Sequence, residues 1–138
     1  MGSPLRVLIV DDQPDVRTMV SIVLRISHIE VVGAATGAAA LGEFEGSKFD
    51  LAIVDIFLQG SNGLDVIRKM RERIADFPIV AMSGMTALDF VVDLPELSGV
   101  ICLQKPFRPA DLARAIEAAT APRSPGAGDV KVAGGAAV

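Results

Sequence analysis

The sequence predicts an α/β fold in which one parallel sheet is covered by helices on both sides. Two observations carry this prediction. Short apolar runs rich in Val and Ile alternate five times with longer segments of helical periodicity, and such alternation is typical of βα units around a parallel sheet. The runs are apolar at successive positions, as in "VLIV" and "LAIV", which indicates strands that are buried on both faces.

The expected elements follow one another in strand–helix order. The strands are Leu5–Val10, Glu30–Ala35, Leu51–Val54, Ile79–Met82 and Val100–Leu103. The helices are Pro14 to about Ser27, a short helix after Thr36, Leu64–Ile74, a segment around Ala87–Leu94 that Pro95 interrupts, and Pro109–Thr120. Pro14 suits a first helical turn, where its missing N–H loses no hydrogen bond, and Thr36 suits a helix cap.

Length and composition fit one globular domain with a tail. The chain has 138 residues, of which 51% are hydrophobic, enough to bury a core. Residues 122–138, "PRSPGAGDVKVAGGAAV", are rich in Pro, Gly and Ala and lack periodicity. We expect a domain over residues 4–121 and a flexible tail or linker stub over 122–138.

Charge and hydropathy exclude several classes of protein. The net charge is −4 and the basic residues are scattered, so direct nucleic-acid binding is not expected. The apolar runs fall far short of the roughly 20 residues that a membrane span needs, and no secretory signal is visible. The single cysteine, Cys102, allows no intramolecular disulfide and fits a reducing compartment such as the cytoplasm.

Polar residues stand where the expected strands end. Asp11 and Asp12 follow the first strand, Asp55 the third, Ser83 the fourth and Lys105 the fifth. Ligands of open parallel sheets bind beyond these carboxyl ends. Each residue alone is ordinary turn chemistry, but their convergence on one rim predicts a functional site.

These residue types together favour phosphoryl transfer. Three clustered carboxylates do not all stay ionised without a counter-charge, and a hard cation such as Mg²⁺ supplies one. A cation and Lys105 would surround one carboxylate with positive charge. We expect Asp55, on the middle strand of the order 2-1-3-4-5, to be the nucleophile. Asp11 and Asp12 would then hold the metal, while Ser83 and Lys105 bind phosphoryl oxygens.

The segments that carry these residues resemble the response-regulator receiver domains of two-component signalling. The resemblance covers about residues 4–121 and rests on "RVLIVDDQPDVR", "DLAIVDIFLQGSNGLDVIRKMR", "PIVAMSG" and "CLQKPF". Gly63 also stands eight residues after Asp55, as in the family. The order and spacing of all four segments agree.

The resemblance implies a flavodoxin-like (βα)5 three-layer sandwich and a regulatory phosphoprotein of the cytoplasm, which is not an enzyme acting on other substrates. It implies that a sensor histidine kinase or histidine phosphotransfer protein phosphorylates Asp55. It assigns Mg²⁺ (or Mn²⁺) to Asp12, Asp55 and the backbone carbonyl of Phe57, with Asp11 assisting. It assigns Ser83 and Lys105 to the phosphoryl group. Output to a downstream protein or a homodimer would use the face of the fourth helix, fifth strand and fifth helix.

The sequence departs from the family at three places. Leu58-Gln59 stands where many members carry Met-Pro, and Cys102 replaces the usual Tyr or Phe. Pro95 falls late in the fourth helical segment. The last two changes touch the expected output face, so a constitutive interaction module stays open as an alternative to a phosphorylated switch.

A true enzyme is the third alternative. No G-x-G-x-x-G follows the first strand, which disfavours a dinucleotide enzyme. No second domain or lid is expected over the rim, which disfavours a phosphohydrolase of small substrates. The lone histidine, His28, is expected at the surface. The sequence leaves open whether the chain is a whole single-domain regulator or an excised receiver.

Overall fold

The structure is a computed structural model that describes residues 5–84, 99–121 and 131–133. In these ranges the main sheet has six strands in the order β2-β1-β3-β6-β7-β8, and every neighbouring pair is parallel. The strands are β1 (Arg6–Val10), β2 (Glu30–Ala34), β3 (Leu51–Asp55), β6 (Ile79–Ser83), β7 (Ile101–Gln104) and β8 (Lys131–Ala133). The first five confirm the expected order 2-1-3-4-5.

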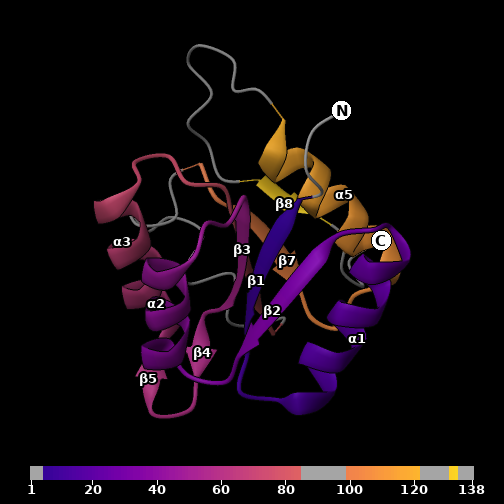
Figure 1. Cartoon of the computed structure of the whole chain (residues 1–138). Coiled ribbons are helices and arrows are strands. Elements are labelled where there is room, and N and C mark those ends of the chain that lie inside the picture. The colour runs from indigo at the N-terminus through magenta and orange to yellow at the C-terminus, as the bar shows by residue number, and fades with distance from the viewer. Residues whose placement is uncertain (1–4, 85–98, 122–130, 134–138) are drawn as a thin grey trace.

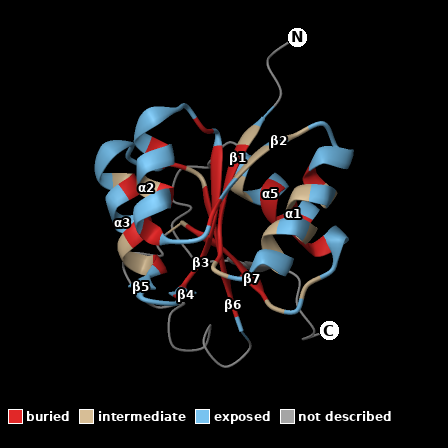
Figure 2. Ribbon diagram, turned by 60° about the horizontal axis from the view of Figure 1, so that its bottom comes forward, coloured by how far each residue is buried: buried red, intermediate tan, exposed pale blue. Residues whose placement is uncertain are grey.

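Four helices of the described residues form the two outer layers. They are α1 (Pro14–Ile26), α2 (Gly37–Gly46), α3 (Gly63–Arg73) and α5 (Pro109–Thr120). Helices α2 and α3 cover one face of the sheet, and α1 and α5 cover the other (Figures 1 and 2). None of the described helices is long and apolar enough to span a bilayer.

Alternating side chains of the strands build a separate core on each face. Leu8 and Val10 pack with residues of α2 and α3, including Phe44 and Met70. Val7 and Ile9, one position away in β1, pack in the core that α1 and α5 complete. Strand β3 is buried along its whole length (Figure 2), as expected for the central strand of a sheet that helices cover on both sides.

Local signals place the helix starts as expected. Pro14 is the first residue of α1. The Thr36 side chain accepts a hydrogen bond from the Ala39 backbone N–H at 3.1 Å, which caps α2. The segment expected around Ala87–Leu94, and Pro95 with it, lies outside the described residues.

The structure adds two features to the expected elements. A hairpin of β4 (Phe57–Leu58) and β5 (Ser61–Asn62) stands between β3 and α3. The tail, expected to lack regular structure, contributes β8 beside β7. Both are two- or three-residue strands held by backbone pairing, too short for a periodic sequence signal.

Candidate functional site

The predicted site residues lie at the carboxyl end of the sheet. Asp11 and Lys105 directly follow β1 and β7, while Asp55 and Ser83 are the last residues of β3 and β6. Parallel pairing aligns these ends, since Val10 pairs with Val54 and Asp55 with Met82. One rim therefore carries residues from four strands, as the ligand-site rule for open sheets leads one to expect.

Three carboxylates meet at this rim. One oxygen from each of Asp11, Asp12 and Asp55 lies within 4.8 Å of the other two. Asp11 is fully buried and Asp55 is 6% exposed, so neither charge is well hydrated. Such oxygen donors suit a hard divalent cation, and the cluster carries more negative charge than Lys105 alone neutralises.

A backbone N–H holds one oxygen of each carboxylate. The Gln13 N–H donates to Asp11 Oδ1 at 2.9 Å and the Phe57 N–H donates to Asp55 Oδ1 at 3.0 Å. The third donor comes from a distant segment, because the Gln59 N–H donates to Asp12 Oδ2 at 3.1 Å. These bonds orient the carboxylates without adding a charge.

Lys105 links the two buried carboxylates. Its Nζ donates to Asp11 Oδ2 at 2.7 Å and to Asp55 Oδ2 at 3.1 Å. The Lys105 side chain is 21% exposed, so the ion pairs are only partly screened by solvent. One ammonium therefore serves two carboxylates, and its place beside Asp55 suits a group that stabilises added negative charge.

Burial and ion pairing act in opposite directions on the two partners. Burial raises the pKa of Asp55, and the hydrogen bonds from the Phe57 N–H and Lys105 offset this only in part. Burial alone would lower the pKa of Lys105, but its contacts with Asp11 and Asp55 outweigh that effect and the pKa is raised. The contacts of Lys105 thus favour its charged form, while burial disfavours the charged form of Asp55.

Ser83 carries an unsatisfied hydroxyl at the same rim. Its Oγ is the one buried side-chain polar atom without a hydrogen-bond partner among the described residues. The backbone of Ser83 is fixed, since its carbonyl accepts the Lys105 N–H at 2.7 Å. A buried hydroxyl without a partner is unfavourable unless something binds it, so this atom fits a ligand that brings acceptor oxygens.

Gly63 permits the chain to turn back over the end of β3. A Cβ at this position would overlap the carbonyl oxygen of Asp55 and crowd the Cα of Ile56. The Gly63 N–H donates to the Ile56 carbonyl at 2.9 Å. Glycine is therefore required where the β4–β5 hairpin returns to the sheet, which keeps that hairpin beside Asp55 and Asp12.

Two contributors to the site were missed in the sequence. The Arg17 guanidinium donates to the backbone carbonyl of Asp11 at 2.8 Å and ties helix α1 to the loop that carries the acidic pair. Gln59 contributes a backbone N–H. An arginine one turn into a helix has many roles, and a backbone donor is common to all residues except proline, so neither carries a residue-type signal.

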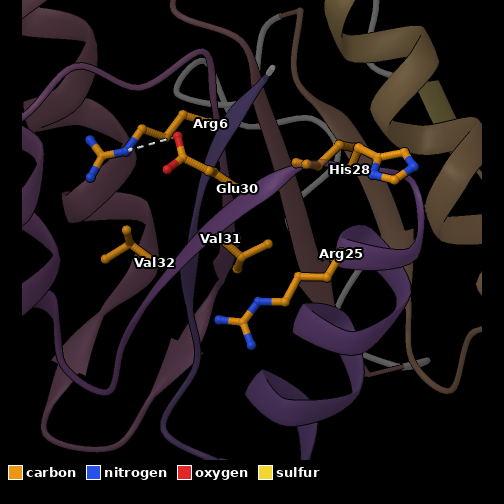
Figure 3. Close-up of a pocket in the computed structure, with 7 residues that line it drawn as sticks. Arg6, Arg25, His28, Glu30, Val31 and Val32 are labelled. Atoms are coloured by element: carbon orange, nitrogen blue, oxygen red, sulfur yellow. Dashed lines mark ion pairs between the residues drawn. The ribbon is translucent and has the colours of Figure 1, made fainter. Parts of the chain in front are cut away.

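A hollow of about 390 Å³ lies at the opposite end of the strands from the acidic rim. Figure 3 shows it around the start of β2, with Arg25 and His28 on one side and the Arg6–Glu30 ion pair on the other. That pair is 3.8 Å long and its side chains are 30% and 65% exposed. His28 is exposed as expected. Arg25, His28 and Glu30 are exposed, unlike the buried Asp11 and Asp55 at the carboxyl end of the sheet.

Comparisons of sequence agree with this geometry. Residues 7–117 match the family described as the response regulator receiver domain. The regulatory protein VanR of Enterococcus faecium is 32% identical over 114 residues, which cover 82% of this chain and 48% of VanR. The DNA-binding response regulator MtrA of Mycolicibacterium smegmatis is 34% identical over 114 residues, which cover 82% of this chain and 49% of MtrA. The chain thus spans about half the length of these relatives.

Comparisons of structure give the same family. The chemotaxis protein CheY4 of Vibrio cholerae is 27% identical with a TM-score of 0.77, over 83% of this chain and 98% of that one. The response regulator TrrA of Thermotoga maritima, solved in complex with Mg²⁺–BeF, is 26% identical with a TM-score of 0.74, over 83% and 98%. The family match includes every strand-end residue of the acidic rim. The chain therefore belongs to the response regulator receiver domains of two-component systems, and its Asp11–Asp12–Asp55 pocket fits a phosphoacceptor site.

Proposed function

We propose that Asp55 is the phosphoacceptor and that its phosphorylation switches the interactions of this chain. The observation that carries the proposal is the shared lysine: Lys105 Nζ contacts both Asp11 and Asp55 at the rim. A phosphoryl group on Asp55 would bring new negative charge beside that ammonium. The donor would be a phosphohistidine of a sensor histidine kinase or of a histidine phosphotransfer protein.

In this transfer a carboxylate oxygen of Asp55 attacks phosphorus. The new bond joins that oxygen to phosphorus, the bond from phosphorus to the imidazole nitrogen breaks, and the imidazole keeps the electron pair. Lys105 and the Ser83 hydroxyl then bind phosphoryl oxygens. Two facts support these roles: the Ser83 Oγ lacks a partner, and Phe57 and Lys105 each occupy one Asp55 oxygen through a hydrogen bond.

A divalent cation completes the proposed site. Asp12, Asp55 and the Phe57 carbonyl would hold Mg²⁺ or Mn²⁺, with Asp11 assisting. The fit rests on the three oxygen donors within 4.8 Å and on the excess of carboxylates over ammonium groups. The ion, when bound, neutralises charge on the transferring phosphoryl group.

The proposed role is regulatory. We expect the chain to catalyse only the gain and loss of its own phosphoryl group, and to act in the cytoplasm. Its receiver residues should make no direct nucleic-acid contact, because the net charge is −4; DNA binding of the kind named for MtrA would belong to a separate domain. The output surface would include β7 and α5, toward a downstream protein or a second copy.

Cys102 favours a second candidate, a constitutive interaction module. This thiol is fully buried in the core on the side of the sheet that α2 and α3 cover, where a small side chain cannot swing outward as a surface aromatic could. A partner that binds equally well with and without beryllofluoride and Mg²⁺ would support the constitutive module, since a ligand blind to two states cannot switch them.

The test is phosphorylation by a small phosphodonor with Mg²⁺. We expect one acid-labile phosphoryl group on the wild-type chain and none on Asp55→Asn. Asp65→Asn is the matched control, because Asp65 lies in the first turn of α3 and its ion pairs are with Arg68 and Lys69 of the same helix. Full labelling of Asp55→Asn would refute the assignment.

A further inference from the structure

The hydrogen bond between Gln59 and Asp12 has no place in the roles proposed above. It joins residues 47 positions apart, whereas the backbone donors of Asp11 and Asp55 come from two residues further along the same loop. Among these three carboxylates, Asp12 alone is held by a backbone N–H of another segment. Asp12 is also the most exposed of the three, so its own loop orients it least.

Gln59 is well placed to act as a fixed donor. It and Gly60 form the turn of the hairpin in which Leu58 pairs with Ser61 and Phe57 with Asn62. Gly60 has a φ of 76°, the left-handed conformation that a tight turn uses. The base of the hairpin is anchored by the Gly63 N–H on the Ile56 carbonyl at 2.9 Å. The direction of the Gln59 N–H is therefore set by the backbone of the hairpin and not by a mobile side chain.

We propose that the Gln59 backbone N–H is a positioning donor that prepares Asp12 for a divalent cation. It occupies Oδ2 and leaves Oδ1 for the ion, so cation binding and the hairpin over residues 57–62 are coupled. The inference rests on the proposed function, in which Asp12 is a metal ligand. It deepens that function by adding a residue whose side chain takes no part.

The physical reason is preorganisation. A carboxylate already held in one orientation loses less freedom when a cation binds. Removing a hydrogen bond that orients a metal ligand typically lowers metal affinity about 10–100-fold. The hydrogen bond joins Asp12 to the hairpin. A cation that fixes Asp12 should therefore also slow the opening of the Gln59–Asp12 hydrogen bond.

Two substitutions at one position separate the backbone donor from the side chain. Gln59→Pro removes the N–H, while Gln59→Ala keeps it. Proline suits the first of the two central residues of a turn when the second, here Gly60, has a positive φ. The preceding Leu58 lies in a strand, and an extended backbone is what a residue before proline prefers. The turn should therefore survive in both variants, which thermal melting checks.

The experiment titrates MgCl₂ into ¹⁵N-labelled protein and follows amide shifts at the rim. We expect Gln59→Pro to bind Mg²⁺ about tenfold more weakly than wild type, and Gln59→Ala to match wild type within about twofold. Equal affinities for the two variants, with wild type binding normally, would overturn this inference alone. Failure of the wild type to bind Mg²⁺ would overturn the proposed metal site as well.

Hydrogen exchange of the residue-59 amide gives an independent measurement. We expect this amide to be protected in wild type and in Gln59→Ala, and to lose protection in Asp12→Ala while the other hairpin amides keep theirs. Mg²⁺ should increase the protection in wild type. An amide at residue 59 that exchanges equally fast with and without the Asp12 carboxylate would contradict the coupling even if the proline variant were unstable.

Discussion

Asp55 and Asp111 are both nearly removed from solvent, at 6% and 1% exposure, yet their pKa values move in opposite directions. Asp111 lies in the first turn of α5 and faces Arg108 and Arg114. Its pKa is lowered, first by the Arg108 backbone N–H and then by the Arg108 side chain. The pKa of Asp55 is raised, because burial outweighs its donors.

The difference lies in how many donors each carboxylate has to itself. Asp111 Oδ2 accepts the Arg108 N–H at 2.9 Å and the Arg108 Nε at 3.3 Å, while its Oδ1 accepts from Arg108 and Arg114. Asp55 has the Phe57 N–H and must share Lys105 with Asp11. A fully satisfied carboxylate stabilises a helix start. An under-satisfied one keeps the capacity to react.

Neutralising the basic side chain that faces each carboxylate should give the largest contrast, measured as the rate of Asp55 phosphorylation. We expect Lys105→Gln to slow phosphorylation of Asp55 by about a hundredfold, the loss typical of removing one group that stabilises the transition state. Arg108→Gln should change that rate by less than roughly twofold, because Arg108 serves Asp111, whose role is structural. Phosphodonor labelling with Mg²⁺ measures both rates. A wild-type rate in Lys105→Gln would remove the shared lysine from the mechanism.

Cys102 extends the comparison to an ionisable group that is buried with no charged partner among the described residues. Burial raises the pKa of its thiol from 9.0 to about 11, which lowers the thiolate fraction about a hundredfold. We expect a thiol reagent to label the folded chain at least that much more slowly than the urea-unfolded chain. Rapid labelling of the folded protein would show that β7 opens readily, and would weaken the view of Cys102 as a fixed core residue.

The same contrast explains what the sequence could predict. The candidate residues of the rim were identifiable because parallel strands end on one rim and each end carries a polar residue. They are Asp11, Asp12, Asp55, Ser83 and Lys105. The hydrogen-bond donors that orient each carboxylate could not be predicted, because they are backbone N–H groups, which every residue type except proline supplies. The Gln59 contact and the burial of Asp111 belong to this second kind.

The shortest elements escaped prediction for a related reason. Strands β4, β5 and β8 are two or three residues long, whereas periodicity needs a longer window. Gly63 was noted for its spacing after Asp55, but the close approach that requires glycine is visible only where the hairpin returns to the Asp55 carbonyl.

Asp111→Asn should lower stability more than any other neutral substitution considered for these carboxylates. Asn keeps the size but loses the charge that Arg108 and Arg114 face. The folded-state pKa of Asp111 lies below its unfolded value. Its contribution is therefore complete above the unfolded pKa of about 4 and is lost as pH falls through the folded pKa. Urea denaturation at several pH values measures this loss. Asp65→Asn should change stability less, because the pairs of Asp65 with Arg68 and Lys69 are exposed and screened by solvent. An Asp111→Asn variant as stable as wild type would mean that Arg108 and Arg114 bind water in place of the carboxylate.

Asp55→Asn should do the reverse, and the effect is the smallest of the set. Removing a charge that burial disfavours and that Asp11 repels should raise the free energy of unfolding in metal-free buffer, on the order of 1 kcal/mol. The sign follows from the raised pKa: ionised Asp55 is unfavourable in the folded state, so its penalty is absent below the unfolded pKa of about 4 and grows as pH rises through the folded value. The gain should thus vanish in acid and reach its plateau once the pH exceeds the raised folded-state pKa of Asp55, opposite to the profile of Asp111. A gain that persists unchanged in acid would trace to packing of the amide, and a loss at neutral pH would mean that Lys105 satisfies Asp55 as fully as the arginines satisfy Asp111.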